Sequence, residues 1–255
     1  MQNLLEIRDL TLTYHTKEFE TKALENLSFN IKDRDFVSIV GPSGCGKTII
    51  LSLIAGLLKQ SSGEILFDGN TINGISDNVG YMFQQDNLFE WLTVENNVLF
   101  GLKIQKKLTE ETKNFAMSLL EKYGLKEFSK HYPSELSGGM RQRVSLIRTL
   151  ATKPRLLLLD EPFSALDYQT RLNIQEIVHK IIIDEHKTTI LVTHDISEAI
   201  VMSNRILILT ERPAKIKTDM HLDFDPTLSP FKRRDSHNFN LYFNQIWEEL
   251  KNEKK

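Results

Sequence analysis

The order of apolar and polar positions predicts a chain in which short strands come first and helices alternate with strands later. Residues 6–14 alternate in part between apolar and polar side chains, which is typical of a strand with one buried face. Residues 48–58 are mostly apolar and follow a glycine-rich turn, so we expect a helix there. Further segments have the short, apolar character of strands: residues 27–31, 36–40, 64–69 and 79–83.

A change of period marks the middle of the chain. From about residue 93 to residue 151, apolar side chains recur at helical spacing, as at Phe115, Leu119 and Tyr123. This stretch predicts a helical subdomain inserted between strands, with bounds at about 86–152.

Strands and helices alternate in the last third of the chain. Strands are predicted at residues 155–160, 188–193 and 205–209, with helices at 168–185 and 196–203 between them. Such an alternation implies a mostly parallel sheet covered by helices. The predicted fold class is therefore α/β, with a mostly parallel core sheet, an N-terminal antiparallel β part and the inserted helical subdomain.

The tail of the chain, residues 235–255, predicts an amphipathic helix. Its apolar side chains are Leu241, Phe243, Ile246, Trp247 and Leu250. The helix can pack on its own domain or on a partner chain, and the sequence leaves both open. We expect the basic run at 232–234 to be solvated, with proximity to anionic lipid as the alternative.

Composition narrows the class of protein. The 255 residues include 32 Lys and Arg against 34 Asp and Glu, a formal net charge of −2, and 40% are hydrophobic. These proportions are ordinary for a globular protein and exclude a collagen, a disordered tail protein and a strongly basic nucleic-acid binder. Cys45 is the single cysteine, so no intrachain disulfide can form. No segment approaches the roughly 18 apolar residues of a membrane span, so a membrane role would need a partner chain.

A phosphate-binding loop is predicted between the strand at 36–40 and the helix that follows it. Triphosphate oxygens must be met at close range by several backbone N–H groups, and glycine removes the side chains that would obstruct this approach. A chance glycine-rich turn is the alternative, but the strand before and the helix after are the context that the motif requires. The loop residues are Gly41, Pro42, Ser43, Gly44, Cys45, Gly46, Lys47 and Thr48.

Two acids follow a run of four leucines at 156–159. A buried strand of a parallel sheet has this character, and ligands bind at the carboxyl ends of such strands. Asp160 is predicted to help hold Mg²⁺, and Glu161 to polarise the attacking water as a general base. Two surface acids at the end of a strand are the alternative.

A second anion-binding helix start is predicted at Ser137, Gly138 and Gly139, where a hydroxyl and two glycines open a helix. The alternative is a plain helix cap with Ser137 as the capping residue. A chain with one phosphate-binding loop does not need a second such helix end for its own nucleotide.

Together these residues resemble the nucleotide-binding subunits of ABC (ATP-binding cassette) transporters. Residues 137–139 match the family signature, Gln84 the Q-loop glutamine and Asp167, within 164–167, the D-loop. His194 matches the switch histidine, and Tyr14 stands where the family places an aromatic ring on adenine. The resemblance runs from about residue 4 to residue 209 with all motifs in family order.

The resemblance implies a P-loop NTPase cassette with ATP and Mg²⁺ as cofactors. It implies an ATPase domain over residues 1–220 and a C-terminal extension over 221–255. Thr48, Gln84 and Asp160 are the implied metal residues, and Glu161, His194 and Gln84 the implied catalytic residues. Tyr14, residues 41–48, 137–139 and Asp167 are the implied nucleotide contacts.

The resemblance also implies partners. Two chains would face head to tail, so that ATP on the loop of one chain is covered by Ser137 and Gly139 of the other. This arrangement accounts for the second anion-binding helix end. A GTPase is excluded by the lack of an Asn-Lys-x-Asp motif, and the chromosome-type family members by the short distance between Lys47 and Ser137.

Within the family, residues 86–98 and 210–216 are similar to the nitrate, sulfonate and taurine importers, although Glu90 stands where that branch often has proline. This implies a peripheral subunit at the cytoplasmic face of the cell membrane, with two permease subunits, indirectly a solute-binding protein, and no nucleic acid. An exporter motor and a non-transport ABC ATPase remain as alternatives. Phe89 and Trp91 are predicted either to contact the permease or to pack within the helical subdomain.

Overall fold

The computed structural model describes residues 3–15 and 19–251, so the end of the expected C-terminal extension, 252–255, lies outside the described residues. The chain divides into two compact units, which are described separately. Unit 1 comprises Met1–Ser76 and His186–Lys255, and unit 2 comprises Asp77–Glu185. The predicted subdomain at 86–152 falls inside unit 2, and the boundaries at 220 and 221 stay predictions.

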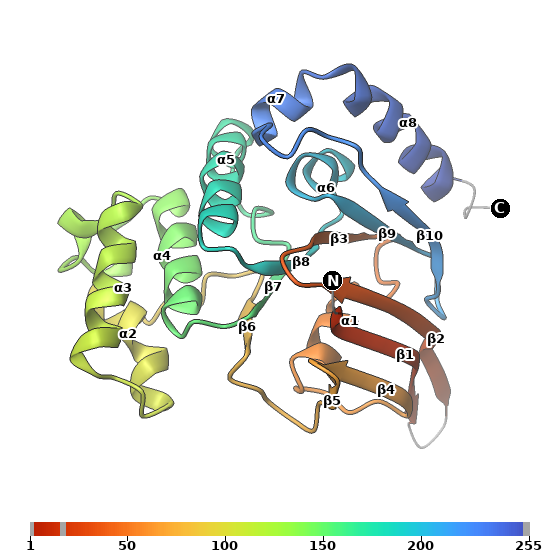
Figure 1. Ribbon diagram of the computed structural model, residues 1–255, viewed down its shortest axis with the longest axis horizontal. Helices are drawn as coiled ribbons and strands as arrows, with labels where there is room; N and C mark the ends of the chain where they lie inside the picture. The colour runs from red at the N-terminus through yellow and green to blue at the C-terminus, as the bar shows by residue number, and fades with distance from the viewer. Residues whose placement is uncertain (1–2, 16–18, 252–255) are drawn as a thin grey trace. The chain divides into compact units, whose positions relative to one another are not determined.

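An antiparallel sheet forms the first layer of unit 1 (Figure 1). Its strands β1 (Asn3–His15), β2 (Glu20–Lys32), β4 (Ser62–Phe67) and β5 (Asn70–Thr71) lie in the order β2-β1-β4-β5. Each neighbouring pair is antiparallel, as predicted for the N-terminal part. The strands β1 and β2 run further than the predicted segments, and each alternates in part between buried and exposed positions.

The other strands of unit 1 are β3 (Phe36–Val40), β8 (Thr188–Val192), β9 (Arg205–Leu209) and β10 (Ile216–His221), in the order β10-β9-β3-β8. The strand β3 is parallel to both β8 and β9. Every residue of these three strands is buried, which is the reason their sequences are mostly apolar. The polar or charged exceptions are Ser38, Thr188, Thr189 and Arg205. The edge strand β10, antiparallel to β9, was not predicted, because its mixture of polar and apolar residues has no fully buried face.

Helix α1 (Lys47–Ile54) is shorter than the predicted segment 48–58. The cause is Gly56, whose φ of 71° is left-handed and ends the helix. A Cβ at Gly56 would lie 2.1 Å from the carbonyl oxygen of Gly74, so only glycine fits this turn. Leu57 and Leu58 are consequently exposed rather than on a helix face.

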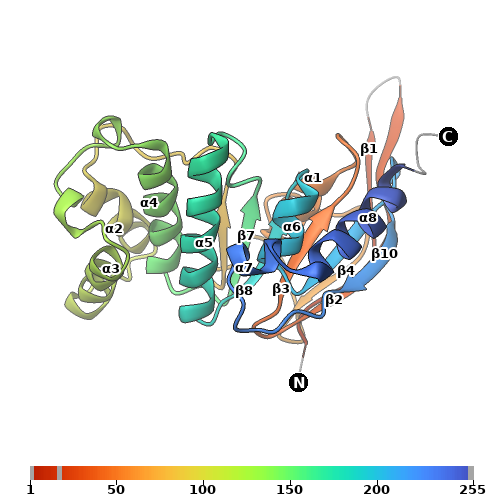
Figure 2. The same cartoon turned by 90° about the horizontal axis from the view of Figure 1, so that it is seen from above.

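The C-terminal helix α8 (His237–Lys251) packs on its own unit against α6 (Ile196–Met202) (Figure 2). Ile246 is fully buried in a cluster with Val40, Ile196 and Ile208. The hydroxyl of Tyr242 accepts the backbone N–H of Asp223 at 2.7 Å. Of the two alternatives, packing on its own domain is therefore present in the structure.

The short helix α7 (Pro230–Arg234) corrects the prediction that the basic run at 232–234 is solvated at one residue, Arg233, while Lys232 is exposed. Arg233 is 5% exposed, and its Nη1 donates to the carbonyl oxygens of Ser203 at 2.9 Å and Val201 at 3.3 Å. These carbonyl groups lie at the end of α6, where helical partners are lacking. The arginine thus caps a helix, which a run of three basic residues does not reveal.

Unit 2 contains the predicted helical stretch (Figure 1). Its helices are α2 (Val94–Ile104), α3 (Glu110–Lys122), α4 (Gly138–Ala151) and α5 (Tyr168–Asp184), and its parallel strands are β6 (Val79–Met82) and β7 (Leu156–Asp160). Short 3₁₀ turns lie at Lys126–Phe128 and Pro133–Glu135. Thr93 and Thr109 cap α2 and α3 through their side-chain oxygens, which sets where these helices begin.

Replacing Ile246 with alanine should destabilise unit 1 by about 2–5 kcal/mol, because it leaves a cavity in a fully buried cluster. Leu241→Ala, on the 48% exposed side of the same helix, is the matched control and should change stability by no more than about 0.5 kcal/mol. Thermal unfolding followed by circular dichroism measures both. Equal effects of the two variants would contradict the packing of α8 on α6.

Candidate functional site

The loop between β3 and α1 has a backbone that only glycine adopts readily. Gly44 has a φ of 74° and Gly46 a φ of 125°, both in the left-handed region. At Gly41 an added Cβ would lie 3.0 Å from Cβ of Leu209 and 3.1 Å from Sγ of the buried Cys45. The glycines of the motif are therefore required by the conformation and by close packing.

Lys47, the first residue of α1, folds back over this loop. Its Nζ donates to the carbonyl oxygens of Gly41 at 2.8 Å and Pro42 at 2.9 Å, and the residue is only 7% exposed. Thr48 follows at an exposed position. The first turn of α1 has no acidic residue and no side-chain cap at Gly46, so the helix start favours an anion.

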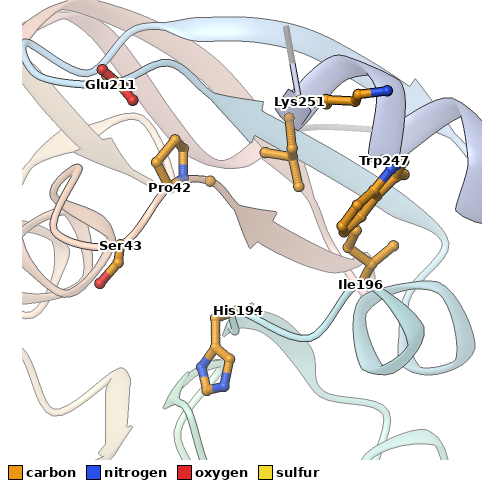
Figure 3. Close-up of a pocket in the computed structure, with 9 residues that line it drawn as sticks. Pro42, Ser43, His194, Ile196, Glu211, Trp247 and Lys251 are labelled. Atoms are coloured by element: carbon orange, nitrogen blue, oxygen red, sulfur yellow. The ribbon is translucent and has the colours of Figure 1, made fainter. Parts of the chain in front are cut away.

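A cavity of about 480 Å³ lies beside the loop, entirely within unit 1 (Figure 3). Ser43 and His194 line it, and Ile196 and Trp247 lie close together on another side. The complete lining is Gly41, Pro42, Ser43, His194, Ile196, Glu211, Trp247, Leu250 and Lys251. The contribution of α8 to this cavity was not predicted, since the amphipathic pattern indicates a buried face but not its neighbours.

His194 is exposed and follows the buried strand β8. The next residue, Asp195, caps α6 by accepting the N–H groups of Ser197 at 2.8 Å and Glu198 at 3.2 Å. The cap fixes where α6 begins and hence where the histidine leaves the strand. Tyr14, at the end of β1, is 42% exposed and is not among the residues that line the cavity.

In unit 2 the two acids stand at the end of β7, as predicted. Asp160 is 5% exposed, and the Tyr81 hydroxyl donates to its Oδ2 at 3.2 Å. Glu161 has a φ of 45°, a left-handed conformation that is uncommon outside glycine and asparagine. This turn of the backbone takes the Glu161 side chain out of the alternation of the strand.

Gln84 is brought to the same place. Its Nε2 donates to Oε2 of Glu161 at 3.3 Å and to Oγ of Ser164 at 3.3 Å. The hydroxyl of Ser164 donates in turn to the carbonyl oxygen of Glu161 at 3.0 Å. Tyr81 and Ser164 were not among the predicted site residues. Their only signal in the sequence was closeness to predicted residues: Tyr81, on β6, is three residues before Gln84, and Ser164 opens the 164–167 segment.

Ser137 caps α4, and its Oγ accepts the N–H of Met140 at 3.3 Å. Ser137 and Gly138 are exposed, and no acidic residue stands in the first turn. Gly139 is buried against α5, where an added Cβ would lie 2.8 Å from Cδ1 of Ile174. Both alternatives for this segment, a cap and an anion-binding helix end, are compatible with this geometry.

Asp167 likewise caps a helix, α5, by accepting the N–H of Thr170 at 3.1 Å. Hydrogen bonds from the Thr170 side chain and backbone lower the pKa of this carboxyl group.

The predicted site residues divide between the two units. Unit 1 carries Tyr14, residues 41–48 and His194, and unit 2 carries Gln84, residues 137–139, Asp160, Glu161 and Asp167.

Over residues 3–15 and 19–251, no helix is long and apolar enough to cross a membrane. The same residues contain no group of three or more His, Cys, Asp or Glu side chains arranged to hold a metal ion.

Three comparisons place these features among known proteins. The profile of the family described as ABC transporter matches residues 24–164. The uncharacterized ABC transporter ATP-binding protein YtlC of Bacillus subtilis is 47% identical over 249 residues, 97% of this chain and 96% of that protein. The aliphatic sulfonates import ATP-binding protein SsuB of Bacillus cereus is 46% identical over 204 residues, 80% of each chain. A dimeric post-hydrolysis structure of the ATP-binding cassette MJ0796 with ADP and Pi has a TM-score of 0.72 and 33% identity, covering 87% of this chain and 100% of that one.

The cavity of unit 1 provides a fluorescence test. The chain has two tryptophans, so Trp91→Phe leaves Trp247 as the single reporter. Because Trp247 lines the cavity with Ser43 and His194, ATP should change its emission. A titration of fluorescence against ATP measures this, and adding Lys47→Ala to the same background should move the response to higher ATP concentration. An unchanged spectrum at saturating ATP would show that the cavity does not respond to the nucleotide.

Proposed function

Because the chain belongs to the ABC transporter family of ATP-hydrolysing subunits, we propose that it powers the import of a small solute through a membrane permease. The relative SsuB, named for aliphatic sulfonate import, confirms the predicted branch resemblance and supports a small anionic or organic solute such as nitrate, sulfonate or taurine. The observation that carries the ATP-dependent part is the glycine loop with the folded-back Lys47.

The loop binds the triphosphate. The left-handed Gly44 and Gly46 turn successive backbone N–H groups toward an anion without side chains in the way. Lys47 exchanges its two carbonyl acceptors for phosphate oxygens, a stronger, charge-assisted hydrogen bond. Pro42, Ser43 and Cys45 complete the loop, and Tyr14 stacks on the adenine ring.

Glu161 polarises the water that attacks the γ-phosphorus. A bond forms from the water oxygen to phosphorus, the bond to the β–γ bridging oxygen breaks, and ADP and phosphate leave. The carboxylate of Glu161 accepts the water proton, and the Gln84 amide holds this carboxylate in place through its N–H donor. His194 contacts the γ-phosphate.

The donor set fits Mg²⁺. Thr48 offers a hydroxyl, Gln84 an amide oxygen and Asp160 a carboxylate, and oxygen ligands are those that this ion prefers. The buried Asp160 carboxylate is already oriented by the Tyr81 hydroxyl, as metal-binding carboxylates commonly are. When bound, the ion neutralises charge that develops on the phosphate oxygens.

A second copy of the chain completes the ATPase. Ser137, Gly138 and Gly139 of one chain cover the ATP held by the other, and Asp167 lies at the same interface. The exposed Ser137 and Gly138 and the acid-free first turn of α4 support this role. ATP then holds two chains together through contacts that are lost after hydrolysis, which makes the nucleotide a switch.

The permease contact is proposed at the segment after Gln84. Trp91 is 74% exposed, whereas the ring of Phe89 lies 4.4 Å from that of Phe100 within unit 2. Trp91 therefore supports the partner alternative and Phe89 the packing alternative. Two permease subunits, and indirectly a solute-binding protein, would hold the chain peripherally at the cytoplasmic face of the membrane.

Two substitutions separate binding from turnover. Glu161→Gln removes the base but no phosphate contact, so ATP binding should persist while hydrolysis falls by about 10²-fold or more. Lys47→Ala removes a charge-assisted phosphate contact and should weaken ATP affinity by about tenfold or more. Equilibrium ATP binding and phosphate release measure the two effects. Normal hydrolysis by Glu161→Gln would remove Glu161 from its role.

The import proposal is tested by what the chain binds. Glu161→Gln, tagged and expressed in its own host, is purified from detergent-solubilised membranes with ATP and Mg²⁺. A multi-span permease should co-purify, and the Lys47→Ala chain is the nucleotide-dependence control. Recovery with nucleic acid or ribosomes and without a permease would support a non-transport ABC ATPase instead.

A further inference from the structure

One face of α4 holds the segment that follows Gln84. Arg141, Ser145 and Arg148 are spaced at i, i+4 and i+7, so they project from the same side of the helix. The Ser145 hydroxyl and Nη2 of Arg148 both donate to the carbonyl oxygen of Asp86, at 3.1 Å and 2.7 Å. Nη1 of Arg148 donates to the carbonyl oxygen of Asn87 at 2.7 Å.

The guanidinium group of Arg141 donates hydrogen bonds to two acids, Asp86 and Glu90. Its Nε and Nη2 donate to the two carboxylate oxygens of Asp86 at 2.8 Å and 3.0 Å, the bidentate geometry that is strongest for this pair. The same Nη2 also donates to Oε1 of Glu90 at 2.7 Å. Burial raises the pKa of Asp86, but the hydrogen bonds from Arg141 and Leu88 outweigh it, so the net pKa is lowered and the pair is ionised.

These contacts between α4 and Asp86 connect two parts of the site. Asp86 is two residues from Gln84, whose amide reaches Glu161 and Ser164. Arg141 also lies close to the start of α4, where residues 137–139 are found. The position of Arg141 therefore bears on both the glutamine and the helix start, although Arg141 touches neither Gln84 nor Glu161.

Glu90 differs from Asp86 in exposure. The Glu90 side chain is 54% exposed and the Asp86 side chain 19%. Glu90 also lines a surface hollow of about 400 Å³, with Lys130, His131, Tyr132, Ser134 and Glu135, all within unit 2. The exposed Trp91 follows it directly in the chain.

The other charges of this hollow have closer partners. Nζ of Lys130 lies 2.5 Å from Oε2 of Glu95, and Oε2 of Glu135 accepts the backbone N–H of Tyr132 at 2.6 Å. Glu90 shares one donor of Arg141 with Asp86 and turns more than half of its side chain to solvent. A cation that approaches the hollow would find an accessible acceptor at Glu90.

We propose that a cationic side chain of the docking permease pairs with Glu90, and that Glu90 thereby passes from Arg141 to the partner. Arg141 is then a positioning residue that keeps its bidentate pair with Asp86 and so relays the docking to Gln84. The exchange is feasible because the half-exposed ion pair between Arg141 and Glu90 is weak, whereas the bidentate pair between Arg141 and Asp86 is strong. This inference rests on the proposed permease partner and deepens it by assigning the charge of the contact.

Glu90→Gln tests the exchange in the purified complex with its permease. The readout is permease-stimulated ATPase activity, as kcat and KM for ATP, at increasing NaCl concentration. Stimulation should fall by about fivefold at low salt, the equivalent of one exposed ion pair, and should lose most of its salt dependence, while KM for ATP stays unchanged. Glu121→Gln, which removes a more exposed ion pair with Lys126 away from the hollow, should behave as the unaltered chain.

Arg141→Lys tests the relay. Lysine keeps the charge but cannot form the bidentate fork, so kcat should fall with little change in KM for ATP. If the two residues act in one path, the double variant with Glu90→Gln should lose less stimulation than the product of the two single losses. Independent, multiplicative losses would overturn the relay.

The outcomes separate this inference from the proposed function. If the unaltered chain is stimulated by its permease and Glu90→Gln is stimulated to the same degree with the same salt dependence, the cation at Glu90 is refuted and the importer proposal stands. If no permease associates with the unaltered chain, both are overturned.

Discussion

The positions of most of the candidate site residues depend on one constraint, the complete burial of the parallel strands that precede them. A strand buried on both faces has mostly apolar side chains, so groups that must meet a ligand are placed where it ends. In unit 1 the phosphate-binding loop follows β3 and His194 follows β8. In unit 2 Gln84 follows β6, and Asp160 and Glu161 stand at the end of β7. Each unit thus presents its reactive groups at the carboxyl ends of parallel strands.

The strands and the phosphate loop could be predicted because their signals are local. A run such as 36–40 is mostly apolar because it is buried, and the glycines after it meet a backbone requirement. The end of α1 was not predictable, because the close approach of Gly56 to Gly74 joins residues 18 apart. The burial of Arg233 was not predictable for a related reason. Its acceptors, Val201 and Ser203, lie 32 and 30 residues away, and nothing in the sequence near it shows them.

The candidate site was predictable to the extent that it follows the family motifs. Tyr81 and Ser164, which orient Asp160 and Glu161, were missed because a hydrogen bond between side chains about 80 residues apart leaves no local pattern. Glu90 is the opposite case. The sequence alone shows it as a departure from the branch, and its hydrogen bond from Arg141 gives that departure a physical meaning.

The order of strands around β3 has a consequence for how the protein forms during synthesis. The partners of β3 are β8 and β9, which begin 152 and 169 residues later in the chain. Until the ribosome has released Val192, the strand that carries the phosphate loop has neither neighbour, and until it has released Leu209 it lacks the second. The closing of such a long loop makes folding slow and leaves apolar edges open meanwhile. In a nascent chain of this protein, the phosphate loop therefore gains its supporting sheet only after β8 and β9 have been synthesised.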